Sequence, residues 1–181
     1  MSLDEPRSRT QDLSTDLQAM VDEWQIRRLH AWYVDAVNRA AWHELAELFR
    51  PDAELTVSRG TGEPDRVVGP VAIGELIGGY VSKYDFLVQV ILNARVSVHE
   101  GGGPDAAVAR LYITEYRQWT GAGRWFESAG VYHDRYVRVD GRWWFAQRRY
   151  DRLYATARSD VEVHPFPEDV PFAGSLRPRK P

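Results

Sequence analysis

Residues 129–150 read AGVYHDRYVRVDGRWWFAQRRY and decide the fold, because two runs of alternating side chains flank Asp140-Gly141. An Asp-Gly pair in that position is a strong signal for a tight β-hairpin turn. Neither face of the first run is purely apolar. One face carries Gly130, Tyr132, Asp134, Tyr136 and Arg138, and the other carries Val131, His133, Arg135, Val137 and Val139. Sheets with one dry and one solvated face sort their residues more cleanly, so this sheet must cover something both apolar and polar.

The hairpin is predicted to belong to a longer antiparallel meander. We expect four strands, at residues 86–99, 106–120, 125–139 and 142–154, and the links between them are short and rich in glycine. Short links between long strands indicate antiparallel neighbours. Strands of this length usually bend, so the predicted sheet has a concave face.

The residues before the meander are predicted to be mainly helical. Apolar residues recur at steps of three and four from Leu17 to Val37, which indicates a long helix over residues 16–40. The further expected elements are a short helix at 41–49, strands at 53–58 and 66–68, and a helix at 70–80. Helices followed by an antiparallel sheet define an α+β fold, and the long helix is expected to cover the concave face.

One domain is expected over residues 16–158. Residues 1–15 are polar and are predicted to be disordered, and residues 159–181 form a tail rich in proline and charge. The first residues lack the apolar core of a secretory signal, and the longest apolar run is far too short to cross a membrane. We therefore expect a soluble cytoplasmic protein.

Composition and motifs exclude several functions. The net charge is −3, and no basic tract with interleaved aromatic residues is present, so nucleic acid is not an expected partner. There is no cysteine, no Gly-rich phosphate loop, no pair of histidines at metal-ligand spacing and no nucleophile elbow. We expect no cofactor and no metal. Seven tryptophans and nine tyrosines suit a pocket for a small apolar molecule, in which acid–base groups would do the chemistry.

The order of these elements resembles the nuclear transport factor 2-like superfamily, and within it the SnoaL-like cyclase and dehydratase group, which is similar to scytalone dehydratase and bile-acid dehydratase. Three stretches carry the resemblance: IRRLHAWYVDAVNRAAWHELAELFRPDAEL (26–55), VQVILNARVSV (88–98) and GVYHDRYVRVDGRWWFAQRR (130–149). The resemblance spans about residues 18–154. It implies a cone, in which a curved antiparallel sheet is closed into an α+β barrel by the helices around a pocket. In such a cone the face with Gly130 and Tyr132 looks into the pocket.

The chain departs from these relatives at their Asp–His pair. In the family, the Asp lies four residues before a Trp, and counting back from Trp42 places Asn38 at that position. The family His lies four residues before an Asn, and counting back from Asn93 places Gln89 there. A further family Tyr falls near Val57. Asn and Gln form hydrogen bonds but do not accept a proton near neutral pH. Dehydration by that pair is therefore not inherited, although Asn38 and Gln89 are expected to bind the substrate.

The second long strand offers a replacement acid. The family register places Leu111, Ile113, Glu115 and Arg117 on the inner face, so Glu115 is the expected catalytic acid–base group. A carboxyl group in an apolar pocket suits that role. A register shifted by one residue would instead turn Tyr112, Thr114 and Tyr116 inward.

Tyr132 is the second expected catalytic residue, as a hydroxyl donor, with core filling as its alternative. Further substrate contacts are expected from Tyr33, His30, Ile113, Arg117 and Arg148. For His30 a core or surface role on the helix competes with ligand contact. For Arg148 a structural pairing with Asp134 competes with it.

The leading hypothesis is a cofactor-independent enzyme of secondary metabolism. It would cyclise, isomerise or dehydrate an apolar polyketide- or terpenoid-like molecule, with Glu115 as the proton shuttle. One alternative is a non-catalytic ligand-binding or accessory protein. Another is the small subunit of a ring-hydroxylating dioxygenase. A homodimer is expected, with the outer row that includes Val131 and Val137 as a candidate contact.

Overall fold

A computed structural model describes residues 9–100, 103–121 and 123–158 of the 181-residue chain. Its helices are α1 (Arg9–Asn38), the 3-10 helix η1 (Trp42–Glu47) and α2 (Pro70–Val81). Its strands are β1 (Phe49–Ser58), β2 (Asp65–Val68), β3 (Tyr84–Val98), β4 (Ala106–Trp119), β5 (Trp125–Val139) and β6 (Arg142–Arg158). In this described part, no helix combines the length and the apolar character that a membrane span requires.

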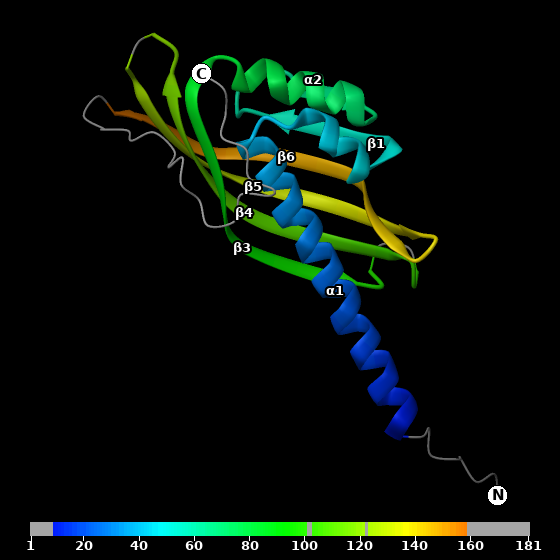
Figure 1. Cartoon of the computed structure of the whole chain (residues 1–181). Coiled ribbons are helices and arrows are strands. Elements are labelled where there is room, and N and C mark those ends of the chain that lie inside the picture. The colour runs from blue at the N-terminus through cyan, green and yellow to red at the C-terminus, as the bar shows by residue number, and fades with distance from the viewer. Residues whose placement is uncertain (1–8, 101–102, 122, 159–181) are drawn as a thin grey trace, which may run out of the picture.

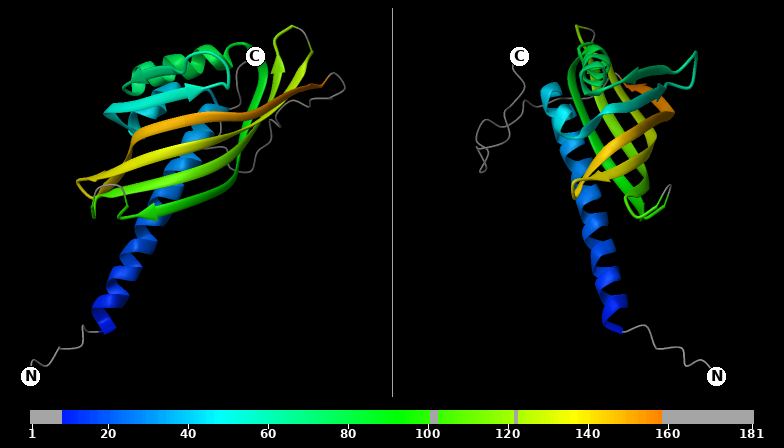
Figure 2. Two further views of the ribbon diagram at one scale, coloured as in Figure 1. Left: turned by 180° about the vertical axis from the view of Figure 1, so that it is seen from behind. Right: turned by 90° about the vertical axis from the view of Figure 1, so that its right-hand side faces the viewer.

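The six strands form one curved sheet in the order β2-β1-β6-β5-β4-β3. α1 crosses one face of this sheet, and α2 lies at one end beside β1 (Figures 1 and 2). The predicted α+β cone is confirmed, with two refinements. The β1–β6 pair is parallel, so the sheet is mixed. The sheet also stays open, because β2 and β3 are its two edges. Short links predicted the β3–β6 meander, but no short link determines where β1 pairs.

α1 begins seven residues earlier than predicted. Residues 9–15, which we expected to be disordered, form its first turns. Leu13 and Leu17 continue the apolar spacing of the helix, and each further residue adds a hydrogen bond once a helix has nucleated. Residues 1–8 and the predicted tail at 159–181 lie outside the described residues.

The segment after α1 was predicted as a longer helix than the structure has. Only Trp42–Glu47 is helical, and β1 starts at Phe49 rather than at residue 53. The sequence Arg50-Pro51-Asp52 lies within β1, where the pairing with β6 shifts register between Phe49 and Glu54. Proline is tolerated at such an irregularity, because no ladder hydrogen bond is required of it there.

Two glycines set the position of α2. The packing at Gly74 and Gly78 is tight, because an added Cβ would lie 3.3 Å from Trp42 Cβ and 3.2 Å from Trp42 Nε1, respectively. The two glycines are one helical turn apart, so they share the face that α2 presents to η1. The indole of Trp42 therefore packs directly against the backbone of α2.

A buried ion pair lies at the centre of the cone. Asp134 on β5 stands opposite Arg148 on β6, and Arg148 donates to both carboxylate oxygens at 2.9 and 2.7 Å. The guanidinium carbon lies 4.0–4.4 Å from the ring centroids of Tyr33, Tyr132 and Phe145. Burial opposes the charged form, but the Asp134 carboxylate and the neighbouring tyrosines raise the pKa of Arg148 above its ordinary value. Asp134, a charged residue on a largely apolar face of β5, thus has both carboxylate oxygens hydrogen-bonded inside the protein.

A second polar contact fastens α1 to the far end of the sheet. Asp22 is 1% exposed and accepts hydrogen bonds from Arg138 at 2.8 Å and from Trp143 Nε1 at 3.0 Å. Arg138 and Trp143 are partners across the β5–β6 hairpin. One carboxylate on the helix therefore ties it to both strands of the hairpin.

The buried pair predicts a large loss of stability in Asp134→Asn. The asparagine keeps the shape of the side chain but leaves the buried charge of Arg148 uncompensated, which costs about 3–5 kcal/mol. Urea unfolding followed by tryptophan fluorescence measures the free energy of unfolding. The matched control is Asp151→Asn, which removes the 2.8 Å contact with the exposed Arg149 and should cost less than about 1 kcal/mol. Equal losses in the two variants would contradict the central role of Asp134.

Candidate functional site

A cavity of about 470 Å³ lies within the cone, between α2 and the concave face of the sheet. This volume is typical of sites for small molecules. Its wall is mostly apolar or aromatic, with Val37, Leu55, Val57, Ile77, Val81, Leu87, Tyr33, Tyr80, Tyr84, Trp119, Phe126, Tyr132, Tyr150 and Ala155. The polar and charged lining residues are Arg59, Thr61, Lys83, Gln89, Glu115, Arg117 and Arg152.

Glu115 reaches the cavity from the middle of β4. Leu111, Ile113 and Arg117 are buried on the same face of the strand, as the predicted register required. The alternative register is wrong, because Tyr112 is 42% exposed and the cavity wall includes none of Tyr112, Thr114 and Tyr116. The strand alternation therefore delivers one carboxylate and one guanidinium to the same wall.

The Glu115 carboxylate is held by residues directly opposite it on the two neighbouring strands. Gln89 on β3 and Ser128 on β5 form one cross-strand row with Glu115. Gln89 Nε2 donates to Glu115 Oε1 at 3.1 Å, and Ser128 Oγ donates to Oε2 at 3.1 Å. Arg117 in turn donates to Ser128 Oγ at 2.7 Å and has Nη1 3.8 Å from Glu115 Oε2. The carboxylate is thus fixed before any ligand binds.

Tyr132 links this row to the centre of the cone. Its hydroxyl accepts a hydrogen bond from Gln89 Nε2 at 3.2 Å, and its ring packs edge-on against Tyr33. Both tyrosines line the cavity. Burial raises the pKa of Tyr33 and raises the pKa of Tyr132 well above the ordinary value. Both hydroxyls therefore keep their protons at neutral pH and remain hydrogen-bond donors.

Asn38 does not line the cavity, although we expected it to bind substrate. Its amide forms two hydrogen bonds with the backbone of Gln89: Nδ2 donates to the carbonyl at 3.0 Å, and Oδ1 accepts from the N–H at 2.7 Å. β3 is an edge strand, so its outer backbone groups have no strand partner. The residue at the family Asp position therefore fastens α1 to β3, and it positions Gln89.

Three other expected contacts also lie away from the cavity wall: His30, Ile113 and Arg148. Ile113 is fully buried in the core, and Arg148 is bound to Asp134. His30 Nε2 lies 2.6 Å from Tyr136 Oη. Burial lowers the pKa of His30 to about 3, so its imidazole is neutral. These residues share the inner face of the sheet or of α1, but the packed half of the cone encloses them.

Several wall residues were missed by the sequence analysis. Arg59 follows β1, Lys83 follows α2 and Arg152 lies in the second half of β6. Tyr80, on α2, donates to Asp65 at 2.5 Å, and burial raises its pKa to about 12. The surplus of arginine in the strand segments was the signal that the sequence offered. It does not show which arginines line the cavity, because that depends on which segments the tertiary structure brings together.

Gly130 makes room for one wall residue. An added Cβ would lie 2.2 Å from Cε2 of Tyr150, whose ring crosses over this position. The Tyr150 side chain thereby reaches the cavity, and burial raises its pKa above the ordinary value. The glycine in the mixed run of β5 is thus explained by a close approach of the neighbouring strand's side chain.

The described part of the chain has no cluster of side chains suited to hold a metal ion. No three or more His, Asp or Glu side chains converge there as metal ligands. The chemistry that this wall offers is acid–base and hydrogen-bonding chemistry, from one carboxylate, several phenols and an amide.

The profile of the SnoaL-like domain family matches residues 18–149, which is most of the chain. Solved structures share the fold. Hexachlorocyclohexane dehydrochlorinase LinA-type3 from Novosphingobium barchaimii is 22% identical, covers 83% of this chain and 99% of its own, and has a TM-score of 0.72. A protein described as a putative scytalone dehydratase from Novosphingobium aromaticivorans is also 22% identical, with coverages of 83% and 93% and a TM-score of 0.66. An NTF2-like protein with a cystatin-like fold from the same organism is 23% identical, covers 82% and 92%, and has a TM-score of 0.65.

The contact at Gly130 predicts that Gly130→Ala destabilises the protein by about 1–3 kcal/mol, because the new methyl group overlaps the Tyr150 ring. Thermal or urea unfolding measures the change. Combining it with Tyr150→Leu should remove most of the penalty, since the overlapping ring is gone. The control is Gly79→Ala on α2, where an added Cβ meets nothing within 4 Å and should stabilise the helix by about 0.5–1 kcal/mol. A penalty that survives in the double variant would contradict the proposed overlap.

Proposed function

This chain belongs to the SnoaL-like domain family, and we propose that it is a cofactor-independent enzyme that moves protons on a small molecule inside the cavity. The reaction class is isomerisation, cyclisation or elimination. The single observation behind this proposal is the Glu115 carboxylate on the cavity wall, held by Gln89 and Ser128 on either side.

Glu115 is the proposed base because of what surrounds it. Among the described residues that line the cavity, it is the one carboxylate, and none is a histidine. The phenols of Tyr132 and Tyr150 have raised pKa values and stay protonated. A carboxylate in a largely apolar wall is the group that can exchange a proton with a substrate carbon.

The tyrosines have the complementary role. When Glu115 removes a proton from carbon, negative charge develops on an adjacent oxygen of the substrate, and a fixed hydroxyl donor stabilises it. The Tyr150 hydroxyl donates to no described residue, and its neighbour Arg152 can only donate to it, so the hydroxyl proton remains available for a substrate oxygen. Tyr132 already accepts from Gln89 and adds a second phenol beside it.

The steps balance without another reactant. In an isomerisation, Glu115 returns the proton it removed to a different carbon. In an elimination, the proton leaves one carbon, hydroxide or halide leaves the next, and a double bond forms between them. The aromatic and aliphatic wall supports a polyketide- or terpenoid-like body for the substrate.

A binding protein without chemistry is the second candidate, and one observation favours it. The Asn38 amide is bonded to the Gln89 backbone on both sides, and each Glu115 oxygen already accepts one hydrogen bond. Such a site binds a ligand and returns it unchanged.

The first experiment is a mass-spectrometric screen of polyketide, terpenoid and related apolar intermediates. Loss of water or halide, or a shifted retention time at constant mass, identifies the substrate. On that substrate, Glu115→Gln should lower kcat by about 10²–10⁴-fold, because the amide cannot take the proton. Glu127→Gln is the control, since Glu127 lies outside the cavity wall and bonds to Tyr154. Full activity in Glu115→Gln would overturn the proposal, and binding without conversion would favour the binding protein.

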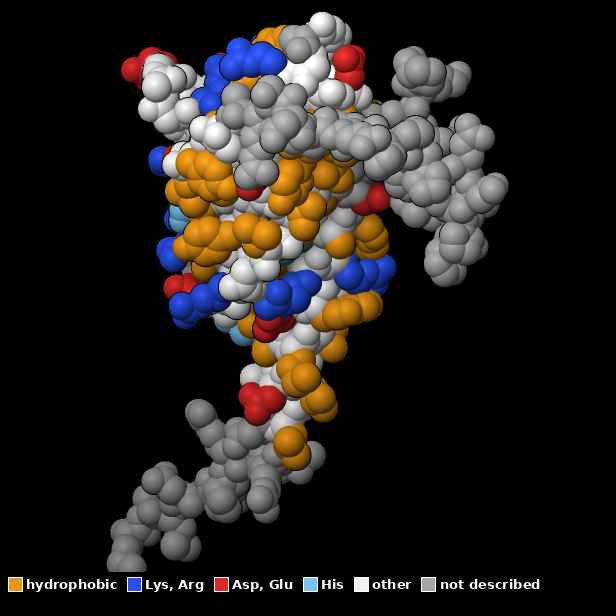
Figure 3. All heavy atoms as spheres, turned by 90° about the vertical axis from the view of Figure 1, so that its left-hand side faces the viewer, with side chains coloured by type: hydrophobic (Ala, Val, Ile, Leu, Met, Phe, Trp, Pro, Cys, Tyr) orange, Lys and Arg blue, Asp and Glu red, His pale blue; other side chains and the backbone are white. Residues whose placement is uncertain are grey.

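We further propose that the chain forms a homodimer. The first turns of α1 extend past the sheet and carry exposed apolar side chains along one side (Figures 1 and 3). They are Leu13, Leu17, Met20 and Trp24, each more than half exposed. Their spacing is that of a helix–helix contact, and a second copy supplies the same stripe in an isologous pair.

Light scattering on the purified protein should therefore give twice the mass of one chain. Leu17→Lys should shift the mass toward one chain, because it places a charge within the apolar contact. The control is Val71→Lys, at an exposed position on α2, which lies at the opposite end of the molecule from the first turns of α1 (Figure 1). A wild-type monomer would contradict the homodimer. A dimer that persists in Leu17→Lys would move the contact to the outer face of the sheet.

A further inference from the structure

We propose that the ligand of this cavity is an organic acid, whose carboxylate is held by Arg117 and Arg152 while its apolar body fills the aromatic part of the wall. This inference rests on the proposed function, since it names the substrate class of the same site. It narrows the expected apolar substrate class to molecules that also carry a carboxylate.

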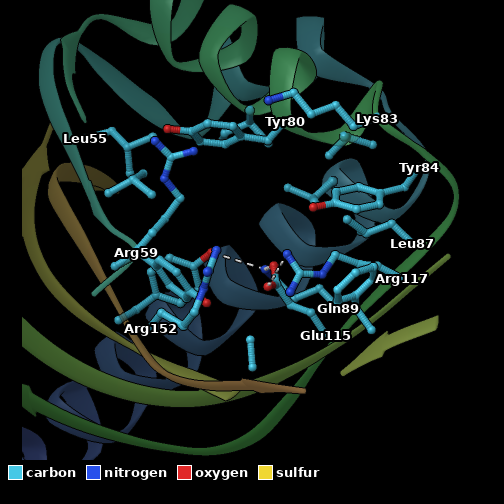
Figure 4. Close-up of a pocket in the computed structure, with 18 of the residues that line it drawn as sticks. Leu55, Arg59, Tyr80, Lys83, Tyr84, Leu87, Gln89, Glu115, Arg117 and Arg152 are labelled. Carbon is cyan, nitrogen blue, oxygen red and sulfur yellow. Dashed lines mark hydrogen bonds and ion pairs between the residues drawn. The ribbon is translucent and has the colours of Figure 1, made fainter. Parts of the chain in front are cut away.

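The charged residues of the cavity wall favour an anionic ligand. Four cations line the cavity, namely Arg59, Lys83, Arg117 and Arg152, against the single carboxylate of Glu115 among the described lining residues. Figure 4 shows Arg152 and Arg117 entering from opposite sides, with Gln89 and Glu115 between them. A wall with this surplus attracts anions and repels cations.

The outer two cations are already occupied or solvated. Arg59 is 2.9 Å from Asp65, and Lys83 is exposed. The inner two differ from them. Arg117 is only 8% exposed. Arg152 has no carboxylate within ion-pair distance among the residues that the structure describes.

Buried polar atoms without hydrogen-bond partners also favour an anionic ligand. Five buried side-chain nitrogen or oxygen atoms lack a hydrogen-bond partner in the described structure, and four of them belong to the cavity wall. They are Arg117 Nε, Arg152 Nε, Tyr150 Oη and Gln89 Oε1. Buried polar groups without partners are costly and therefore rare. Three of the four are N–H or O–H donors, and an ionised carboxylate is the group that only accepts.

These three donors lie close together. Burial is the main reason that the pKa of Tyr150 is raised, and the charges of both Arg152 and Arg117 act against that rise. All three side chains line the same cavity, and Arg152 lies within hydrogen-bonding reach of the Tyr150 hydroxyl. Gly130 stands directly opposite Arg152 in the β5–β6 pairing, and the Tyr150 ring occupies the space that a side chain at Gly130 would take.

Glu115 does not satisfy these groups itself. Its oxygens accept from Gln89 and Ser128, and its nearest approach to Arg117 is 3.8 Å, at Nη1 rather than at the unpartnered Nε. A bound carboxylate would lie between the Arg117 and Arg152 guanidinium groups, beside the Tyr150 side chain. The two arginines also neutralise the ligand, which lets an anion approach the Glu115 carboxylate.

The test compares acids with their neutral methyl esters, using benzoate, naphthalene-2-carboxylate and decanoate as probes in titration calorimetry. At least one acid should bind the wild-type protein about tenfold or more tightly than its ester, since charge-assisted hydrogen bonds form only with the acid. Arg152→Gln should remove most of this advantage, and Arg152→Lys should retain part of it. Arg135→Gln is the control, because Arg135 is exposed and lies outside this cavity.

Arg117→Gln is tested in parallel, with its melting temperature as the check on folding, since Arg117 also bonds to Ser128. Equal affinity for acid and ester overturns the inference, as does the absence of measurable binding by any of the acids. An advantage of the acid that persists in Arg152→Gln overturns the assignment of the site.

The assay separates this inference from the proposed function, because the probes are not converted. Glu115→Gln should bind the acids as tightly as the wild-type protein or more tightly, since it removes a nearby negative charge. Discrimination between acid and ester, with full turnover in Glu115→Gln, would leave the organic-acid site standing and remove the proposed base. Equal affinity for acid and ester, with lost turnover in Glu115→Gln, would keep Glu115 as the base and exclude organic acids as the substrate class.

Discussion

The ion pair between Asp134 and Arg148 is the interaction on which the rest of the interior depends. A lone charge in that position would be expensive to bury, so the pair is stable only because both groups are hydrogen-bonded and enclosed. The guanidinium is surrounded by rings from α1, β5 and β6, which are Tyr33, Tyr132 and Phe145. The pair thus fixes the helix against the sheet and fills one half of the cone. The other half remains open as the cavity.

A continuous set of ring contacts and hydrogen bonds runs from that centre to the site. Tyr132 packs on Arg148 and bonds to Gln89, Gln89 bonds to Glu115, and Ser128 joins Glu115 to Arg117. Gln89, Glu115 and Ser128 lie directly opposite one another on three adjacent strands, so the sheet itself holds them in place. A site fixed in this way does not need to reorganise when charge develops on a ligand.

Asn38 and Gln89, at the two positions of the family Asp–His pair, have structural roles in this chain. Asn38 holds the backbone of β3, and Gln89 holds the Glu115 carboxylate, so the residues at these two positions are hydrogen-bonded to each other without a titrating pair. The proton-exchanging group that we propose has moved one strand inward, to β4. Three arginines and one lysine from separate parts of the chain give this cavity its cationic character, on which the proposed acidic ligand rests.

The sequence by itself determined the α+β class, the hairpin at Asp140-Gly141 and the α2 helix, because periodicity and turn chemistry are local properties. The inward register of Glu115 and Arg117 came from the family resemblance, since alternation alone left two registers open. The sequence also placed Tyr33, Gln89 and Tyr132, which do reach the cavity. Alternation identifies the face of a strand but not which residues of that face are covered. His30, Ile113 and Arg148 were therefore grouped with the site, although the packed half of the cone encloses them. A register shift in β6 between Phe145 and Gln147 turns Arg148, Tyr150 and Arg152 inward together with Phe145, against simple alternation. Only the tertiary structure decided this, because bulges, sheet curvature and the pairing of β1 with β6 bring together residues that no local pattern connects.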